Sequence, residues 1–351
     1  KVAFVANVGS LVAPTSYDDF RAKRQLPVGL FSHADLQRHW MTVVPQDRAH
    51  IYGWGGKMAD ILQSGNDPSG ISMNISLSGS NKFQTGKFVA PYSIDSGSDG
   101  GATQVSGYSP DPESLTNARV KMFNKIRAGL LTQTYSNLMA KTFAQTELLS
   151  MESALEFNTT VSSQEITTPF ATDSFSKRMK RVAQAIAARE ALGQHRQVFF
   201  VRLGGFDNHA SLLTNHAELM QTVSEGLSSF YQATVELNVQ DSVTAFSASD
   251  FGRTLSSNGK GSDHAWGGNH FVMGGAVDGG QIRGDYPTSL LTPTINGDNI
   301  NLGRGRLIPT TSVDQYCSEM AKWFGVSPSN FPDIFPNLSN FNSEPSLNLF
   351  T

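Results

Sequence analysis

Two neighbouring stretches of the chain, 249–254 and 261–271, hold an unusual density of groups that can do chemistry. The first follows a strand-like apolar run and the second leads into another, so both fall within one strand-to-strand connection. Connections at strand ends are where α/β proteins place their chemistry. Carboxylate oxygens and imidazole nitrogens are ligands that zinc and other divalent metals accept. The candidate groups are Asp250, Arg253, Asp263, His264 and His270.

A second candidate cluster follows a buried strand predicted over 198–203. This strand delivers a glycine turn, then Asp207 and His209, and then a helix predicted from 213 to 237. That arrangement presents side chains above a parallel sheet. Asp207 and His209 stand two residues apart on a loop, so both can turn toward one metal ion. The plainer interpretation stays open: these loop side chains only cap turns, because their spacing matches no short metal signature.

Ser32 has two interpretations. Ser32 followed by Asp35 has the form of a capping box, which predicts a helix that begins there and runs through Trp40. The same geometry suits a nucleophile, because the N-terminus of a helix stabilises an attacking alkoxide and binds an oxyanion. A cap alone, and a cap that is also the nucleophile, both fit the sequence.

Composition excludes several classes of function. The 351 residues include 16% charged residues and carry a net charge of −3, against about 25% charged residues in ordinary domains. The sequence therefore has no electrostatic footprint for nucleic acid or for an anionic membrane. The one cysteine, Cys317, excludes an internal disulfide and is expected to be a small packed residue of a helix. No apolar run is long enough to span a bilayer, and there is no signal-peptide pattern.

The order of predicted elements indicates one α/β domain that spans 1–351. Residues 2–8 predict a buried parallel strand at the very start of the chain, so we expect an upstream N-terminal strand to be missing. Residues 64–112 are rich in Ser, Gly, Asn and Asp. The alternation at 71–77 predicts a strand, followed by a long surface excursion that is either a rim over a site or a surface for other chains. Apolar spacing predicts helical segments over 112–148 and 173–192.

Seven motifs occur in order along nearly the whole chain: VANVG at 5–9, FSHAD at 31–35, GWGG at 53–56, LGGFDNH at 203–209, SDFGRT at 249–254, SDHAWGG at 262–268 and FPNL at 335–338. The ordered set resembles the bacterial exported domain-of-unknown-function family numbered 1501, placed in the alkaline phosphatase/sulfatase superfamily. The resemblance implies a three-layer α/β/α fold around a central, mostly parallel sheet. It also implies export, in many members by the twin-arginine route, to a periplasmic or extracellular location.

The resemblance further implies roles for the candidate residues. The nucleophile would be Ser32, and Arg253 would hold the anion through two hydrogen bonds. Divalent ions, zinc first and otherwise calcium, magnesium or manganese, would activate the nucleophile and stabilise the attacking and leaving oxygens. Family members carry an earlier strand with a Gly-Gly-Asn-Asp-Gly-like segment, whose Asp would bridge the metals and which this sequence lacks. The metal ligands would be Asp207 and His209 at one site, Asp250, Asp263 and His264 at a second, and His270 as a late histidine.

Two functions from different classes follow. The first is a metal-dependent hydrolase that acts on small phosphate or sulfate esters, and the clusters of acids and imidazoles at strand ends favour it. The second is a secreted binding or structural subunit that keeps the fold with an incomplete metal site. The absent first strand, the low charge and the polar excursion favour this second function, which would place the chain in a homo-oligomer or an extracellular assembly.

Overall fold

The computed structural model of the chain describes residues 1–68, 71–94, 116–287, 290, 300–341 and 347–351. Its strands are β1 (Val2–Gly9), β2 (Asn74–Ser76), β3 (Tyr92–Ser93), β4 (Val198–Phe200), β5 (Thr244–Phe246), β6 (Gly268–Gly274), β7 (Ile282–Arg283) and β8 (Thr311–Ser312). Its helices are α1 (Tyr17–Arg21), α2 (His33–Thr42), α3 (Trp54–Leu62), α4 (Ala118–Leu131), α5 (Leu138–Ser162), α6 (Ser174–Ala187), α7 (Leu212–Glu236), α9 (Val313–Trp323) and α10 (Phe331–Ile334). Short 3-10 turns are η1 (Gln63–Gly65), η3 (Pro328–Asn330) and η4 (Leu338–Asn340).

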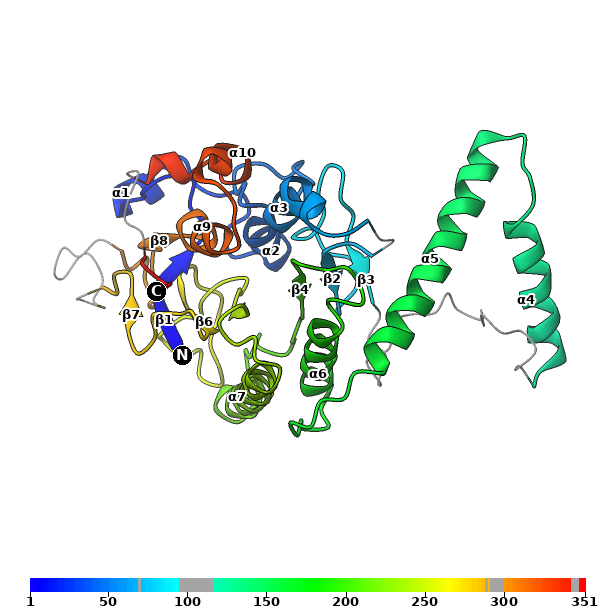
Figure 1. The fold of residues 1–351 in the computed structure, drawn as a ribbon. Helices are drawn as coiled ribbons and strands as arrows, with labels where there is room; N and C mark the ends of the chain where they lie inside the picture. The colour runs from blue at the N-terminus through cyan, green and yellow to red at the C-terminus, as the bar shows by residue number, and fades with distance from the viewer. Residues whose placement is uncertain (69–70, 95–115, 288–289, 291–299, 342–346) are drawn as a thin grey trace.

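The strands form a five-stranded and a three-stranded sheet (Figure 1). In the larger sheet β1 pairs antiparallel with β6 and parallel with β7 and β8, and β6 also pairs antiparallel with β5. In the smaller sheet β2 lies parallel to β3 and β4. The predicted α/β class is confirmed, whereas a mostly parallel central sheet is wrong for the larger one. The reason is that residues 247–267 return the chain beside β5 without a crossover helix, which reverses the next strand.

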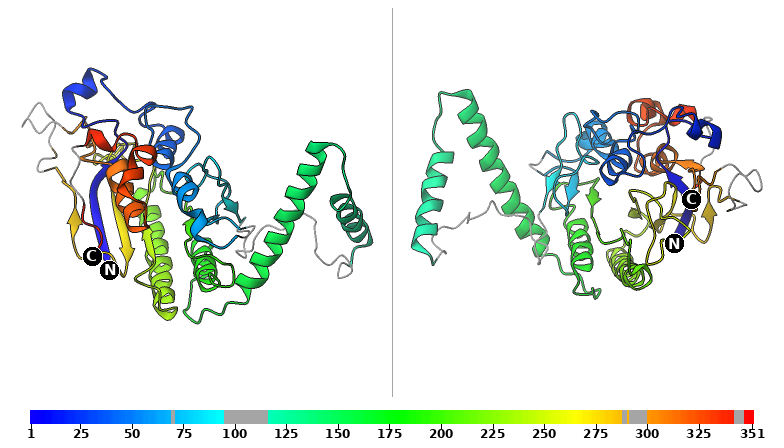
Figure 2. Two further views of the ribbon diagram at one scale, coloured as in Figure 1. Left: turned by 45° about the horizontal axis from the view of Figure 1, so that its top comes forward. Right: turned by 180° about the vertical axis from the view of Figure 1, so that it is seen from behind.

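Two large hydrophobic clusters lie on opposite faces of the strands, since Val272 of β6 belongs to the first and Met273 to the second. Figure 2 shows the helices that flank the strands. The first joins the larger sheet to α2, α3 and α9 around Trp54 and Tyr316. The second joins the smaller sheet to α6, α7 and the C-terminal half of α5, around Ile75, Phe157 and Met179. The helices predicted over 173–192 and 213–237 are confirmed as α6 and α7, whose apolar stripes supply much of the second cluster.

The predicted polar stretch and the predicted long helical stretch agree with the structure in part. The strand predicted at 71–77 is confirmed as β2, the middle strand of the smaller sheet, and Ile71, Met73, Ile75 and Leu77 are buried, so the surface excursion does not include these residues. Residues 95–112 of that expected excursion lie outside the described residues. The helical segment predicted over 112–148 is two helices, α4 and α5, and α5 continues to Ser162. No helix in the part of the chain that the structure describes has the length and apolarity to cross a bilayer.

Helix α9 carries a buried acid that sets a pH dependence of folding. Cys317 is buried in this helix, as predicted, and Asp314 in its first turn is also buried. Burial raises the pKa of Asp314 to about 8, against the opposing effects of backbone hydrogen bonds and of Lys57. Because the folded pKa lies above the unfolded value of 3.8, folding takes up a proton at intermediate pH. The contribution of Asp314 to the free energy of unfolding is fully present below the unfolded pKa. It is lost as pH rises through about 8.

We therefore expect Asp314→Asn to stabilise the protein at alkaline pH. An amide has similar shape and carries no charge to desolvate, so the melting temperature at about pH 9 should rise by several degrees relative to the unsubstituted chain. The gain should vanish near about pH 4, where the buried carboxyl is already neutral. Calorimetric melting across this range checks it, with the exposed Asp333→Asn as control. A gain that is constant across pH would show that titration of Asp314 is not the cause.

Candidate metal centre

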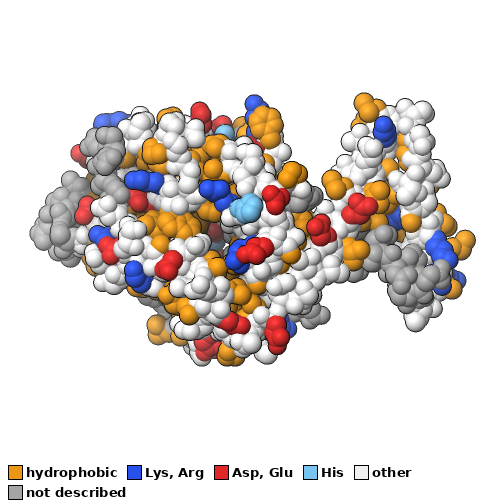
Figure 3. Space-filling view, viewed as in Figure 1, with side chains coloured by type: hydrophobic (Ala, Val, Ile, Leu, Met, Phe, Trp, Pro, Cys, Tyr) orange, Lys and Arg blue, Asp and Glu red, His pale blue; other side chains and the backbone are white. Residues whose placement is uncertain are grey.

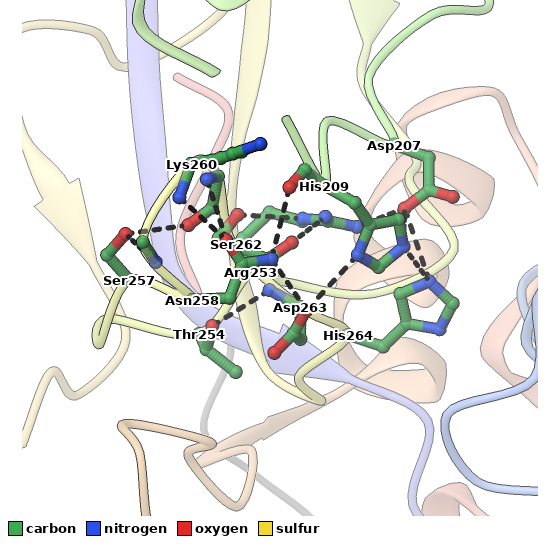
Figure 4. A network of polar contacts seen from close by, with 12 residues as sticks. Asp207, His209, Arg253, Thr254, Ser257, Asn258, Lys260, Ser262, Asp263 and His264 are labelled. Atoms are coloured by element: carbon green, nitrogen blue, oxygen red, sulfur yellow. Dashed lines mark hydrogen bonds and ion pairs between the residues drawn. The ribbon is translucent and has the colours of Figure 1, made fainter. Parts of the chain in front are cut away.

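Three imidazole nitrogens meet at one carboxylate in the loops above the strand ends. Figure 4 shows two of them, those of His209 and His264, beside Asp207. The Oδ2 atom of Asp207 lies 3.1 Å from His33 Nε2. Its Oδ1 atom lies 3.0 Å from His209 Nε2 and 3.2 Å from His264 Nε2. Ligand atoms of His33, Asp207 and His264 all lie within 4.8 Å of one another. The turn after β4, the β5–β6 connection and the N-terminus of α2 thus bring their polar groups to one point.

The other ring nitrogens fix how the two loop histidines can be protonated. His264 Nδ1 lies 2.8 Å from the carbonyl oxygen of Phe31, which only accepts, so this nitrogen carries the proton. His209 Nδ1 lies 3.2 Å from Asp263 Oδ1 and carries its proton for the same reason. In the neutral rings both Nε2 atoms are then bare acceptors, 3.2 Å apart and beside Asp207 Oδ1. Three facing acceptors need extra protons or a cation between them, so the donor set fits a metal ion.

Helix α2 presents His33 to the cluster from a second direction. His33 Nδ1 lies 2.7 Å from Asp250 Oδ2, and Gln37, one helical turn later, donates from Nε2 to the same oxygen at 2.9 Å. Partial burial alone would lower the pKa of His33, but the carboxylates of Asp250 and Asp207 outweigh it and raise the pKa. Asp250 thereby orients a ring whose other nitrogen faces Asp207, which is how acids support metal-binding histidines.

Asp207 and Asp263 are both ionised at any ordinary pH. Burial alone would raise the pKa of Asp207, but hydrogen bonds from Arg253 and His33 outweigh it and hold the pKa at about 2. Asn258, Arg304 and His209 hold the pKa of Asp263 at about 2 as well. The cluster thus presents permanent negative charge, which attracts a divalent cation.

The β5–β6 connection folds into a narrow antiparallel ribbon that positions its side chains. Gly252 N donates to Trp266 O at 3.1 Å, and Thr254 N donates to Asp263 O at 3.0 Å. The ribbon sets Arg253 opposite His264. Gly261 lies so close to the backbone of His209 that a Cβ there would collide with it. A glycine at this position therefore lets the two candidate loops touch.

The contacts of Arg253 differ from the expected grip on an anion. Its Nη1 binds Asp207, its Nε donates to Ser262 Oγ at 3.0 Å and its Nη2 donates to the carbonyl of Ser262. All three nitrogens face protein groups, so in this structure Arg253 positions Asp207. The expected bidentate contact with substrate would require these bonds to break.

Two expected site residues lie outside these contacts. His270 is buried within the core, where its ring packs 4.5 Å from that of Trp40 and its Nδ1 lies 3.2 Å from Ser247 Oγ. Burial lowers the pKa of His270 to about 4, so it is a neutral packed residue and the structure does not bring it to the other candidate ligands. Ser32 is the N-cap of α2, as predicted, but its side chain makes no capping hydrogen bond, so the expected capping box is wrong. Its place next to His33 still puts it beside the cluster.

A family model described as "Protein of unknown function (DUF1501)" matches residues 7–297. The chain belongs to the DUF1501 family. The resemblance seen in the seven motifs is thus confirmed at the level of the family. Comparison with curated proteins and with solved structures finds no match.

The DUF1501 match includes every residue of the imidazole and carboxylate cluster. Sequence reasoning missed His33 and Gln37 as members, because both were absorbed into the pattern of an amphipathic helix. One signal was available: His33 follows Ser32 directly and lies four residues before Gln37, so both face one side of a helix N-terminus. Arg304, whose Nη1 lies 2.6 Å from Asp263 Oδ2, was missed too and had no recognisable signal, since it comes from a distant turn.

Proposed function

We propose that this DUF1501 protein is a metal-dependent hydrolase of small phosphate or sulfate esters. The observation that carries the proposal is the convergence of His33, His209 and His264 on the ionised Asp207. Imidazole and carboxylate donors suit zinc best, and carboxylates also suit calcium, magnesium or manganese. Such a bound cation would supply Lewis-acid stabilisation of a developing oxyanion. The proposal includes export to the periplasm or the extracellular space, as the family resemblance implies.

The protein groups around the cluster have separate roles in this proposal. Asp207 and the three imidazoles hold the cation, and Asp250 keeps the ring of His33 in place. Arg253 holds Asp207 in its orientation. Ser32 is the nucleophile: its oxygen attacks the phosphorus or sulfur atom from the N-terminus of α2, its proton passes to water, and the bond from that atom to the leaving oxygen breaks. The leaving alkoxide or phenoxide takes a proton from water. A second water then hydrolyses the serine ester, which releases phosphate or sulfate and restores the hydroxyl of Ser32.

Two measurements test the proposal together. Metal content by mass spectrometry should show a divalent ion bound in a stoichiometric amount, and aryl phosphates or aryl sulfates should be hydrolysed. Ser32→Ala should remove turnover and leave the metal in place, because the proposed ligands are Asp207 and the imidazoles rather than this hydroxyl. A protein that binds no divalent metal and hydrolyses neither ester class would refute the proposal.

We also propose that the domain is alkaline phosphatase-like and that one further strand lies between β4 and β5. The two strands belong to separate sheets, yet β4 leads to Asp207 and β5 leads to Asp250, and both acids touch His33. The strands therefore run in the same direction. Trp54 packs against Phe246 of β5 on one side, and α6 packs against α7 on the other, so the space between the strands is covered on both faces.

The facing edges of β4 and β5 are suited to receive a strand. Val198 N and Phe200 O bond toward β2, so the N–H and C=O groups of Phe199 point away from it. On β5, Ser247 N bonds to Phe271 O, so by alternation the backbone groups of Phe246 point away from β6. Apart from Thr244, the residues of both strands are apolar, and all are only partly buried, which is typical of inner strands that lack a neighbour. A parallel strand between them would join the two sheets into one.

Hydrogen exchange can test whether a strand occupies this position. In the 351-residue chain the amides of Phe199 and Phe246 should exchange as free edge amides, whereas those of Val5 and Ile75 should be protected. In protein that carries the proposed strand, Phe199 and Phe246 should gain protection of about 10³-fold or more. Residue-resolved exchange measurements check this. Equally fast exchange of both amides in the two proteins would show that the edges stay open.

A second candidate function is a non-catalytic binding subunit, and one observation favours it. The side chain of Asp207 is 41% exposed, and most residues of the cluster around it are also partly exposed. Such exposure is typical of a site that is open to solvent on one side. If the histidines of the cluster bind protons and no metal, at every metal concentration tested, the result would support the binding subunit over the hydrolase.

A further inference from the structure

Helices α4 and α5 form a hairpin that stands away from the body of the protein (Figures 1 and 2). The C-terminal half of α5 is anchored firmly, because Phe157 and Val161 are fully buried in the second hydrophobic cluster. The N-terminal half of α5 and all of α4 extend beyond that anchor. The hairpin is therefore a projecting arm with a fixed base.

The arm exposes far more apolar side chain than a solvated helix pair needs. Ten large apolar residues on it are between 36% and 81% exposed, and Figure 3 shows apolar groups on its surface. They are Val120, Met122, Phe123, Ile126 and Leu130 on α4, and Leu138, Met139, Phe143, Leu149 and Leu155 on α5. Ten exposed large apolar side chains on one projecting pair of helices exceed the singly scattered ones of an ordinary surface, and this favours an interaction site.

The interior of the arm is too small to stabilise it alone. The buried apolar residues between the two helices are Leu131, Ala144 and Met151, with Tyr135 packed against them. One ion pair, Arg127 with Glu147, also joins the helices. Two helices normally need a further layer to bury their apolar stripes. The arm thus lacks about half of a helical bundle.

We propose that two copies of this chain dimerise by packing their α4–α5 arms into a four-helix bundle. A two-fold axis would set each α4 against the partner's α5, which is the self-complementary arrangement of most dimers. Helix α4 carries four basic residues, Arg119, Lys121, Lys125 and Arg127, and no acid, whereas α5 carries three acids, Glu147, Glu152 and Glu156, and one base, Lys141. Arg127 and Glu147 already pair within the arm. The excess of bases on α4 and of acids on α5 still favours α4 against the partner's α5 over like helices packed together.

The available area also fits a second copy. Complete burial of an aromatic side chain removes about 150–250 Å² from water. Phe123 and Phe143 still expose 57% and 68% of theirs, and eight further apolar side chains of the arm are partly exposed as well. Covering them approaches the roughly 800 Å² per partner that a stable interface buries. The anchored base of α5 reduces the ordering cost of association, because the arm is already held in one orientation.

Sedimentation velocity and light scattering of the whole chain test the proposal. The unsubstituted protein should be a dimer at micromolar concentration. The double variant Phe123→Glu, Phe143→Glu should raise the dissociation constant by about 100-fold or more, since it removes two central aromatic contacts. Both side chains are exposed, so the monomer should stay folded. The matched control is Phe88→Glu, an 80% exposed phenylalanine outside the arm, which should leave the dimer intact.

Several outcomes would overturn the proposal. These are a monomeric unsubstituted protein, a dimer that survives the double variant, and a dimer that Phe88→Glu disrupts equally. Co-sedimentation of a monomer with phosphatidylglycerol vesicles would assign the arm to a lipid surface instead. The readout is independent of the proposed hydrolase, because association is measured without metal or substrate. A monomeric variant that still binds metal would separate the two proposals.

Discussion

Asp207→Asn is expected to lower ester hydrolysis by about 10³-fold, the kinetic equivalent of about 4 kcal/mol of lost transition-state stabilisation. The substitution keeps the shape of the side chain and removes the negative charge on which three imidazoles converge. An amide binds a divalent cation more weakly than an ionised carboxylate does. The amount of bound metal should therefore fall together with the activity. Metal stoichiometry by mass spectrometry and turnover of an aryl phosphate or sulfate check the two effects.

The control for this prediction is Asp67→Asn, which removes an equally simple charge from an exposed acid away from the cluster. It should change neither metal content nor turnover. Because Asp207 is a loop residue, its variant should also keep nearly the melting temperature of the unsubstituted protein. Full metal content in the Asp207→Asn variant would refute the assignment of Asp207 as a ligand, whatever the activity of that variant.

Trp266→Ala is expected to cost about 3–5 kcal/mol of unfolding free energy, the usual range for a large buried aromatic. Trp266 is 1% exposed and packs with Leu11, Ile308 and Phe341 in a small cluster. Its Nε1 donates to Ser10 O at 2.9 Å, so the variant also leaves a buried carbonyl without its donor. Denaturant unfolding measures the loss.

The effect of Trp266→Ala should reach the candidate metal centre. Trp266 lies two residues after His264 and anchors the returning half of the ribbon to the end of β1. A loosened ribbon would displace His264 from Asp207, so metal affinity should fall together with stability. Trp323→Ala is the matched control, because this half-buried indole stacks on Phe350 at the protein's edge, away from the cluster. If Trp266→Ala and Trp323→Ala lowered metal affinity equally, Trp266 would have no special role in holding the ribbon.

The sequence was sufficient for features that depend on neighbours along the chain. The spacing of Met179, Val182 and Ile186 predicts α6, because a helix brings residues three and four apart onto one face. The apolar run at 198–203 predicts a strand, although only 198–200 is strand in the structure. The placement of Asp207 and His209 on the following turn needed no more than that strand and two glycines. Family membership also followed from motif order alone.

Other predictions failed where distant contacts decide. The spacing at Val120, Phe123 and Ile126 predicts a helix correctly, but periodicity does not say what covers the apolar face, and in this chain it is exposed. His270 has the residue type of a ligand, yet it points into the core between Trp40 and Tyr316. The direction of β6 depends on how a connection of some twenty residues turns back, which local propensity does not encode.

The sequence by itself thus determined the main helices and strands, the turns that carry Asp207, His209 and His264, and the family to which the chain belongs. Tertiary structure alone decided that His33 joins Asp207 while His270 does not, that Arg253 binds an acid of its own chain, and that among the described residues no strand pairs with the facing edges of β4 and β5. The physical reason is the separation along the chain over which each signal acts. Residue type and periodicity reflect only a few neighbouring residues. Distances between groups more than two hundred residues apart, such as His33 and Asp250, are set by the packing of the whole core.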